Sequence, residues 1–216
     1  MHLQKEWLPI RMAGEDNMDD QERAVLAIAS RLLSYPSNTG EELAAIHECI
    51  EENVTSTALR IKLHAASSAI YDLSEQERKE TYVSTFDLRS KLGLYLTGHE
   101  FGDSNKRGAA IIQLQKIISD AGFDRVDDEL ADYIPMLFEF LVVHPEDDNN
   151  TWLRRRLAVA IQRMKDFIYG DNPYAPILYV LMEFVFDEPT KEEIKKLEFE
   201  REDADLENLP YPMLYQ

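Results

Sequence analysis

Cysteine, glycine and long apolar runs are all scarce in this chain of 216 residues. The single cysteine, Cys49, excludes an internal disulfide and a cysteine-cluster metal site, which is typical of a reducing compartment. Eight glycines and nine prolines are too few for a turn-rich sandwich or barrel. The longest apolar stretch, Pro176 to Phe186, is interrupted by Glu183 and is much shorter than the roughly 20 residues of a membrane span. We therefore expect a cytoplasmic protein with no direct membrane insertion.

Basic side chains are also in short supply. The chain has 23 lysines and arginines against 41 acidic residues, which gives a formal net charge of −18. Binding DNA or RNA needs basic side chains that displace counterions from phosphates, so this charge excludes nucleic acid as a partner. The same repulsion disfavours an anionic membrane surface. The charge permits a partner that carries positive charge.

Apolar residues make up 44% of the chain, enough for a sizeable core, and their spacing is helical almost throughout. Residues recur three and four apart on one face, and no segment shows sustained two-residue alternation. We predict an all-α protein, a single globular domain of about eight helices over residues 21–186. Residues 1–20 are predicted to be an acidic flexible lead-in. Residues 187–216 are predicted to be a charged, partly disordered tail, with one short helix near Lys191 to Phe199.

Capping residues predict where several of these helices begin. Ser74 and Glu77 form the capping-box pattern, and so do Thr39 and Glu42. The helix after Ser74 is expected to run to about Thr97, and residues 98–104 are expected to form a turn.

Later helices carry their own boundary signals. Asp103 or Ser104 is expected to cap the next helix, and Ala121-Gly122 is expected to end it. Asp132 is expected to be the N-cap of the helix that contains Pro135. Thr151 and Asn172 are expected to cap the last two apolar helices, with Gly170 ending the first of them.

Enzymatic signatures are largely missing. The chain has no phosphate-binding glycine loop, no dinucleotide fingerprint and no nucleophile elbow, and its five histidines are scattered. Cys49 is interpreted as a small residue partly inside a helical core. Carboxylates at residues 127–132 fit helix N-terminal stabilisation, and an acidic patch that receives a cationic peptide remains open. The run Arg154 to Arg156 fits a solvated face or a set of ion pairs.

Two stretches carry a family resemblance. The first is Tyr82-Val83-Ser84-Thr85-Phe86-Asp87, followed twelve positions after Asp87 by His99-Glu100-Phe101-Gly102-Asp103-Ser104-Asn105-Lys106-Arg107-Gly108. The second is Glu129-Leu130-Ala131-Asp132-Tyr133-Ile134-Pro135-Met136-Leu137-Phe138-Glu139-Phe140-Leu141. In this order and separation they resemble the NarJ branch of the TorD/DmsD/NarJ redox-enzyme maturation chaperones, which assemble molybdenum reductases. The family pattern E-L-P-D-H lacks its proline and histidine here, which argues against a nucleotide role and suggests a client outside the best-known nitrate reductases.

The resemblance implies an all-helical chaperone and not an enzyme. Such a chaperone binds the N-terminal segment of the catalytic subunit of a molybdenum reductase and assists molybdenum cofactor insertion. It holds no cofactor permanently, but it handles delivery of the molybdopterin-guanine-dinucleotide cofactor to its client. A client segment that forms an amphipathic helix would lie in a groove between helices, with basic flanks against an acidic rim.

The resemblance places the client-binding groove near the turn at residues 98–107 and the helix that opens at Asp132. The residues expected to bind the client are Tyr82, Phe86, Asp87, His99, Arg107, Glu129, Asp132, Tyr133, Phe138 and Glu139. Structural roles compete for some of them. Tyr82 and Phe86 are spaced as a buried pair, Arg107 is favoured as an internal ion-pair partner of Asp87 or Asp103, and His99 as a hydrogen-bonded turn residue.

Two other functions remain open at this point: a weak nucleotide-binding enzyme on a helical scaffold, and a generic adaptor that binds a basic peptide through its acidic surface or tail. The oligomeric state is also open, because the apolar helix Ala175 to Phe186 suits either burial in a monomer or a domain-swapped dimer.

Overall fold

The structure is a computed structural model that describes residues 18–36, 40–123, 129–144 and 148–197. Its helices are α1 (Asp20–Leu32), α2 (Gly40–Asn53), α3 (Thr57–Tyr71), α4 (Glu75–Tyr82), the π-helical turn η1 (Val83–Asp87), α5 (Leu96–Phe101), α6 (Lys106–Asp120), α7 (Ile134–Val143), α8 (Asp148–Phe167) and α9 (Ala175–Phe184). Residues 191–197 form a further short helix. The described residues contain no strand, only an isolated bridge, so the all-α prediction is confirmed.

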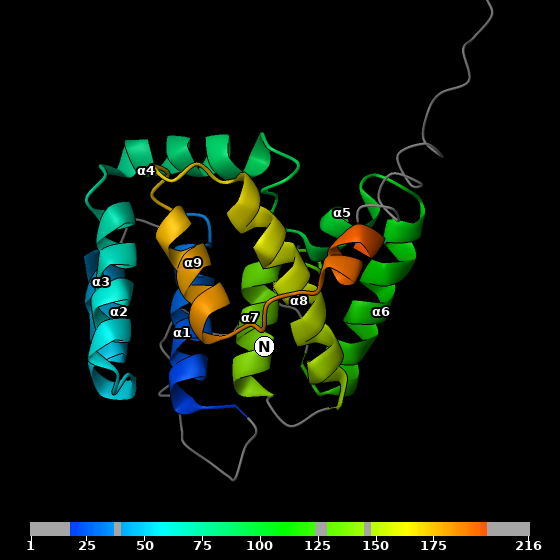
Figure 1. The fold of residues 1–216 in the computed structure, drawn as a ribbon, viewed down its shortest axis with the longest axis horizontal. Helices are drawn as coiled ribbons and strands as arrows, with labels where there is room; N and C mark the ends of the chain where they lie inside the picture. The colour runs from blue at the N-terminus through cyan, green and yellow to red at the C-terminus, as the bar shows by residue number, and fades with distance from the viewer. Residues whose placement is uncertain (1–17, 37–39, 124–128, 145–147, 198–216) are drawn as a thin grey trace, which may run out of the picture.

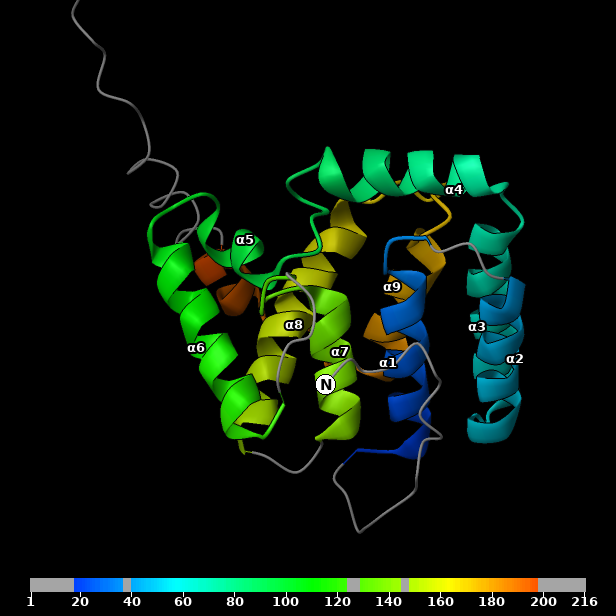
Figure 2. The same ribbon diagram turned by 180° about the vertical axis from the view of Figure 1, so that it is seen from behind.

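The core lies between two layers of helices. Helices α1 and α7 form one layer and α8 and α9 the other, and α1 also contacts α9 (Figures 1 and 2). Helices α2 and α3 flank this core at one end, α5 and α6 lie at the other, and α4 crosses the top of the bundle (Figure 1). Within this single chain α9 packs against α1, α3 and α8, and its Ile177, Leu178 and Leu181 side chains are fully buried.

Local chemistry explains several helix starts. Asp19 caps α1, with its carboxylate accepting a hydrogen bond from the Gln21 backbone. The Ser74–Glu77 capping box at α4 is confirmed in both directions. The Ser104 hydroxyl accepts a hydrogen bond from the Lys106 backbone at 3.0 Å, at the start of α6. Gly122, with φ at 85°, follows the C-terminus of α6 as the sequence predicts. Thr39 lies outside the described residues.

The region after α4 differs from the sequence prediction. Helix α4 continues only through η1 and ends at Asp87, so a helix reaching Thr97 is wrong. Instead a hydrogen-bonded turn at residues 90–92 is followed by a short extended stretch around Tyr95, in which the side chains of Leu94 and Leu96 on either side are buried. Residues 98–101 are helical in α5, and the turn begins only at Gly102, whose φ is 54°.

Two other predicted boundaries are wrong, and one is close. Helix α8 begins at Asp148, three residues before Thr151, and ends at Phe167, before Gly170. Asp132 does not cap α7, because Tyr133 occupies the N-cap position and the Asp132 carboxylate bonds elsewhere. The Asn172 side chain accepts a hydrogen bond from the Tyr174 backbone at 2.9 Å, just before α9.

The arginine triplet on α8 forms ion pairs, as one of its two sequence interpretations states. Arg154 reaches Glu22 at 3.1 Å, Arg155 binds Glu193 of the last helix, and Arg156 binds Glu100 of α5. One run of basic residues therefore ties α8 to three different parts of the bundle.

Cys49 is buried among apolar side chains, as predicted, with 4% of its surface exposed. Burial raises the pKa of its thiol to about 12, because the thiolate is poorly solvated there. Relative to the ordinary value of 9.0, the thiolate fraction at pH 8 falls about a thousandfold. We therefore expect Cys49 to react with a disulfide reagent at pH 8 at least about a hundredfold more slowly in the native protein than in denaturant. An exposed thiol introduced as Lys116→Cys is the control, and equal rates for both thiols would contradict the burial.

Candidate functional site

Two segments that carry the sequence motifs meet in the fold. The Leu96 backbone N–H donates to the Asp132 carbonyl at 2.8 Å, and the Ile134 N–H donates to the Leu94 carbonyl at 2.8 Å. These bonds form the isolated antiparallel bridge between Tyr95 and Tyr133. The two tyrosine rings consequently lie 5.7 Å apart, centroid to centroid. The bridge thus places residues 38 positions apart in the chain on one surface.

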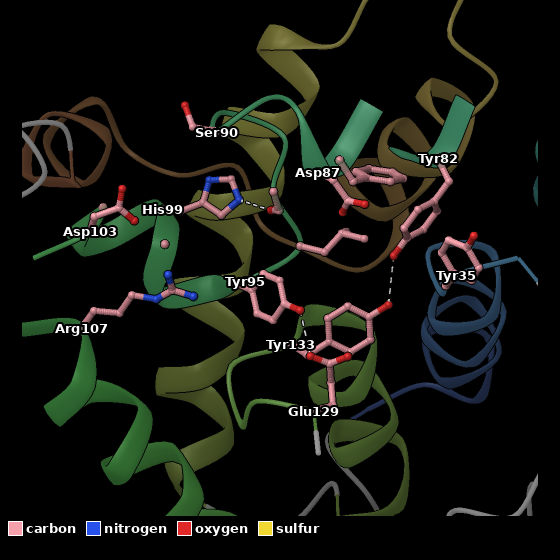
Figure 3. A pocket seen from close by; sticks show the side chains of 15 residues that line it. Tyr35, Tyr82, Asp87, Ser90, Tyr95, His99, Asp103, Arg107, Glu129 and Tyr133 are labelled. Atoms are coloured by element: carbon pink, nitrogen blue, oxygen red, sulfur yellow. Dashed lines mark hydrogen bonds between the residues drawn. The ribbon is translucent and has the colours of Figure 1, made fainter. Parts of the chain in front are cut away.

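A pocket of about 470 Å³ opens on this surface (Figure 3). It lies between the C-terminal end of α4, the extended segment before α5, the α5–α6 turn and the residues before α7. Its lining consists of Tyr35, Tyr82, Phe86, Asp87, Ser90, Gly93, Leu94, Tyr95, Gly98, His99, Gly102, Asp103, Arg107, Glu129 and Tyr133. Seven of the ten residues predicted from the sequence line this one pocket.

Aromatic rings form one wall of the pocket. Tyr82 packs edge to face against Phe86 at 5.0 Å and against Tyr35 at 5.3 Å. The hydroxyls of Tyr82 and Tyr133 lie 3.2 Å apart, within hydrogen-bonding distance. Burial raises the pKa of both phenols above the ordinary value, so both keep their protons at neutral pH. Tyr35 is 54% exposed, which leaves this wall accessible from solvent.

Acidic groups dominate the charge of the lining. Asp87 and Asp103 are exposed, and the Asp87 carboxylate has no hydrogen-bond or ion-pair partner in the described part of the chain. The Glu129 carboxylate accepts a hydrogen bond from the Tyr95 hydroxyl at 2.8 Å (Figure 3). Burial, together with this contact with Glu129, raises the pKa of Tyr95. A cavity with aromatic rings and carboxylates is suited to a ligand that is apolar along one side and cationic at a point.

His99 holds the pocket together from inside. It is 1% exposed, and its Nε2 lies 2.7 Å from the carbonyl oxygen of Gly93. This contact fixes the extended segment before α5 against α5 itself. The prediction of a hydrogen-bonded residue is confirmed, although the residue lies on a helix and not in a turn.

Arg107 is an internal ion-pair partner, but the predicted partners are wrong. Its guanidinium pairs with Asp132, at 3.7 Å between Nη2 and Oδ2, and not with Asp87 or Asp103. Its Nε donates to the Thr97 hydroxyl at 3.2 Å. Asp132 is completely buried, and its Oδ2 accepts from the backbone and hydroxyl of Thr97. Asp132 therefore lies behind the pocket and does not line it.

Two predicted residues lie away from the pocket. Phe138 is fully buried in the core, where its ring lies 6.0 Å from that of Phe186. Glu139 accepts a hydrogen bond from the Ser30 hydroxyl at 2.8 Å and lies 3.7 Å from Arg31. Both residues face the neighbouring helices of the core, which their position on α7 requires.

The sequence reasoning missed several lining residues, above all Tyr35 and Tyr95. The sequence places Tyr35 only at a helix end, and no local signal links it to the pocket. Tyr95 lies between the buried Leu94 and Leu96, so its outward position follows from the alternation of an extended segment. That two-residue alternation is the signal that could have found it.

Metal and membrane features are not found in the described ranges. No group of three His, Cys, Asp or Glu residues there could hold a metal ion. None of the described helices combines the length and apolar character needed to cross a membrane.

The fold is shared with a protein of known structure. The crystal structure of a putative redox enzyme maturation protein from Archaeoglobus fulgidus superposes with a TM-score of 0.59 at 19% identity. The match covers 81% of this chain and 98% of that one. The helical architecture of this chain is thus the same fold as that of this putative maturation protein.

The sequence comparisons then identify the family. The family model for the nitrate reductase delta subunit matches residues 35–178, and the chain belongs to this family. The probable nitrate reductase molybdenum cofactor assembly chaperone NarJ of Bacillus subtilis is 26% identical over 153 residues, which covers 71% of this chain and 83% of that protein. The NarJ assembly chaperone of Escherichia coli K12 is 27% identical over 164 residues, 72% of this chain and 59% of that protein. The chain is therefore a member of a family of assembly chaperones and not of enzymes.

Proposed function

We propose that this chain is a cytoplasmic chaperone that binds the N-terminal segment of the catalytic subunit of a nitrate reductase-like molybdenum enzyme. While that segment is held, the client receives its molybdopterin-guanine-dinucleotide cofactor, which the chaperone does not retain. We further propose that it acts as a monomer, because α9 is already buried within its own chain. The family membership is the basis of this proposal. The identity of the client segment and the place where it binds are proposed in addition.

One observation carries the choice of site. The two motif-bearing segments are joined by the Tyr95–Tyr133 bridge, and the pocket lies where they join. Its aromatic wall offers apolar contact to one face of a client helix, and Asp87 and Asp103 offer negative charge at its edge. Electrostatic complementarity of this kind raises the association rate and the selectivity more than the affinity.

Isothermal titration with peptides tests the proposal. The peptides are the first ~20 residues of each molybdenum reductase catalytic subunit of the source organism, a length of about five helical turns. We expect one of them to bind, and Asp87→Asn to weaken that binding about threefold to tenfold, because a single exposed carboxylate contributes about 1 kcal/mol. Raising the salt concentration should slow association in the unsubstituted protein.

The controls separate this site from other acidic surfaces. Glu188→Gln removes an equal charge from an exposed position that does not line the pocket, and it should leave binding unchanged. Deleting residues 198–216 should also leave the pocket's affinity intact. If the deletion abolishes binding and Asp87→Asn does not change it, the results would favour an adaptor that binds through its tail. Failure of every peptide to bind would refute the proposed function.

A further inference from the structure

The charge balance of the pocket depends on one arginine. Three carboxylates and Arg107 line the cavity, together with the buried His99. Arg107 extends from α6 along the ring of Tyr95, with the guanidinium carbon 5.7 Å from the ring centroid. Its Nε donates to the Thr97 hydroxyl at 3.2 Å. The side chain is 26% exposed, so it borders the cavity without being fully solvated.

The carboxylate that faces Arg107 comes from behind the pocket. Asp132 has no exposed surface, and its Oδ2 lies 3.7 Å from the Arg107 Nη2. The same oxygen accepts hydrogen bonds from the backbone N–H and the hydroxyl of Thr97. Its Oδ1 has no hydrogen-bond partner in the described part of the chain. A buried carboxylate is costly unless it is paired, and Arg107 is the cation that pairs with it.

We propose that Asp132 is a positioning residue that acts on the client site through Arg107. Asp132 holds the Arg107 guanidinium on the Tyr95 side of the cavity. Because Asp132 lies behind the lining, it neutralises the arginine without using a carboxylate of the pocket itself. The negative charge of Asp87 is then left to meet a cationic side chain of the client, either arginine or lysine. This inference rests on the proposed function, and it assigns Asp132 a role different from the direct client contact that the sequence suggests.

Removing the anchor has a defined consequence. In Asp132→Asn the Arg107 guanidinium loses its buried counterion and is attracted to the carboxylates of its own pocket, such as Asp87. The pocket then loses net negative charge at the point where the client's cation binds. If Asp132 had only a structural role, Asp132→Asn would lose binding only to the extent that it loses its fold, and the loss would not depend on Arg107.

The test titrates four proteins with the peptide that the unsubstituted protein binds and with a copy whose arginines are replaced by citrulline and lysines by norleucine. We expect Asp132→Asn to weaken the cationic peptide about tenfold, equal to about 1.4 kcal/mol. Asp132→Asn combined with Arg107→Gln should bind the cationic peptide at least about threefold more tightly than Asp132→Asn alone, because no guanidinium is left to occupy the carboxylates of the pocket. Arg107→Gln alone leaves the buried Asp132 carboxylate without its cation, so its thermal unfolding is compared with its affinity. The neutral peptide should bind all four proteins about equally. Circular dichroism and thermal unfolding of each protein report on folding.

Rescue by the second substitution is the decisive readout. If the double variant is as weak as Asp132→Asn, or if Asp132→Asn binds as well as the unsubstituted protein, the inference is wrong and Asp132 is structural only. If Asp132→Asn alone does not fold, the double variant, which buries no unpaired charge, is compared with the unsubstituted protein. It should keep the preference for the cationic over the neutral peptide, and loss of that preference would refute the inference. Binding of no peptide by the unsubstituted protein would refute the proposed function and this inference together, whereas binding without rescue refutes only the inference.

Discussion

Replacing Arg156 by alanine is expected to lower the free energy of unfolding by about 3–5 kcal/mol, because it leaves the buried Glu100 carboxylate without its counterion. Arg156 of α8 binds Glu100 of α5 through two of its guanidinium nitrogens. Their side chains are only 14% and 10% exposed. The Trp152 ring also lies 4.2 Å from the guanidinium of Arg156. Urea denaturation followed by circular dichroism measures the change.

The neighbouring arginine provides a matched control. Arg155 makes a similar two-nitrogen contact with Glu193, but the two side chains are 36% and 33% exposed. Solvent screening reduces such a pair to about 0–1 kcal/mol, so Arg155→Ala should have a much smaller effect. Equal losses for the two variants would mean that burial of the Glu100 pair does not govern the stability of this part of the bundle. Because α5 carries His99, we also expect Arg156→Ala to weaken peptide binding.

Replacing Phe138 by alanine is the second substitution with a large expected effect. The side chain is fully buried on α7, with its ring beside that of Phe186 just after α9, so its loss should cost about 3–5 kcal/mol through lost burial and a residual cavity. Phe167→Ala removes the same group from a position that is 44% exposed, and it should cost less than about 1 kcal/mol. Thermal or urea unfolding distinguishes the two.

A conservative substitution separates the core role of Phe138 from client contact. Phe138→Leu keeps most of the apolar volume, and since the residue does not line the pocket, peptide affinity should stay within about twofold. A tenfold loss of affinity in a stably folded Phe138→Leu protein would instead support the direct contact that the family resemblance suggests.

The all-α class and most helices could be predicted from the sequence because their signals are local. The run Val25 to Leu33 buries one continuous face, and Ser74 and Glu77 cap the helix that they precede. The segment at Leu92, Leu94 and Leu96 could not be assigned correctly by helical spacing. Leucine favours helices, and the extended form is stabilised by pairing with residues near position 133, which no local propensity reports.

The site was predicted in part for a related reason. Motif positions near Asp87, Arg107 and Glu129 converge on the pocket because the family pattern marks segments that lie together in space. The family pattern does not predict the direction in which each side chain points. Whether Asp132 faces the pocket or the interior depends on the hydrogen bonds of Thr97, 35 residues away in the chain. Only the folded structure supplies that information.

The Tyr95–Tyr133 bridge also has a consequence for the order of events during synthesis. The pocket needs residues from Tyr35 to Tyr133, and its two halves are joined by backbone bonds that close a loop of nearly forty residues. Closing such a loop costs entropy before any contact within it is gained. A nascent chain that has folded only α1 to α4 therefore has one wall of the pocket and not the other. The proposed client site is therefore complete only after the sequence through α7 has emerged from the ribosome.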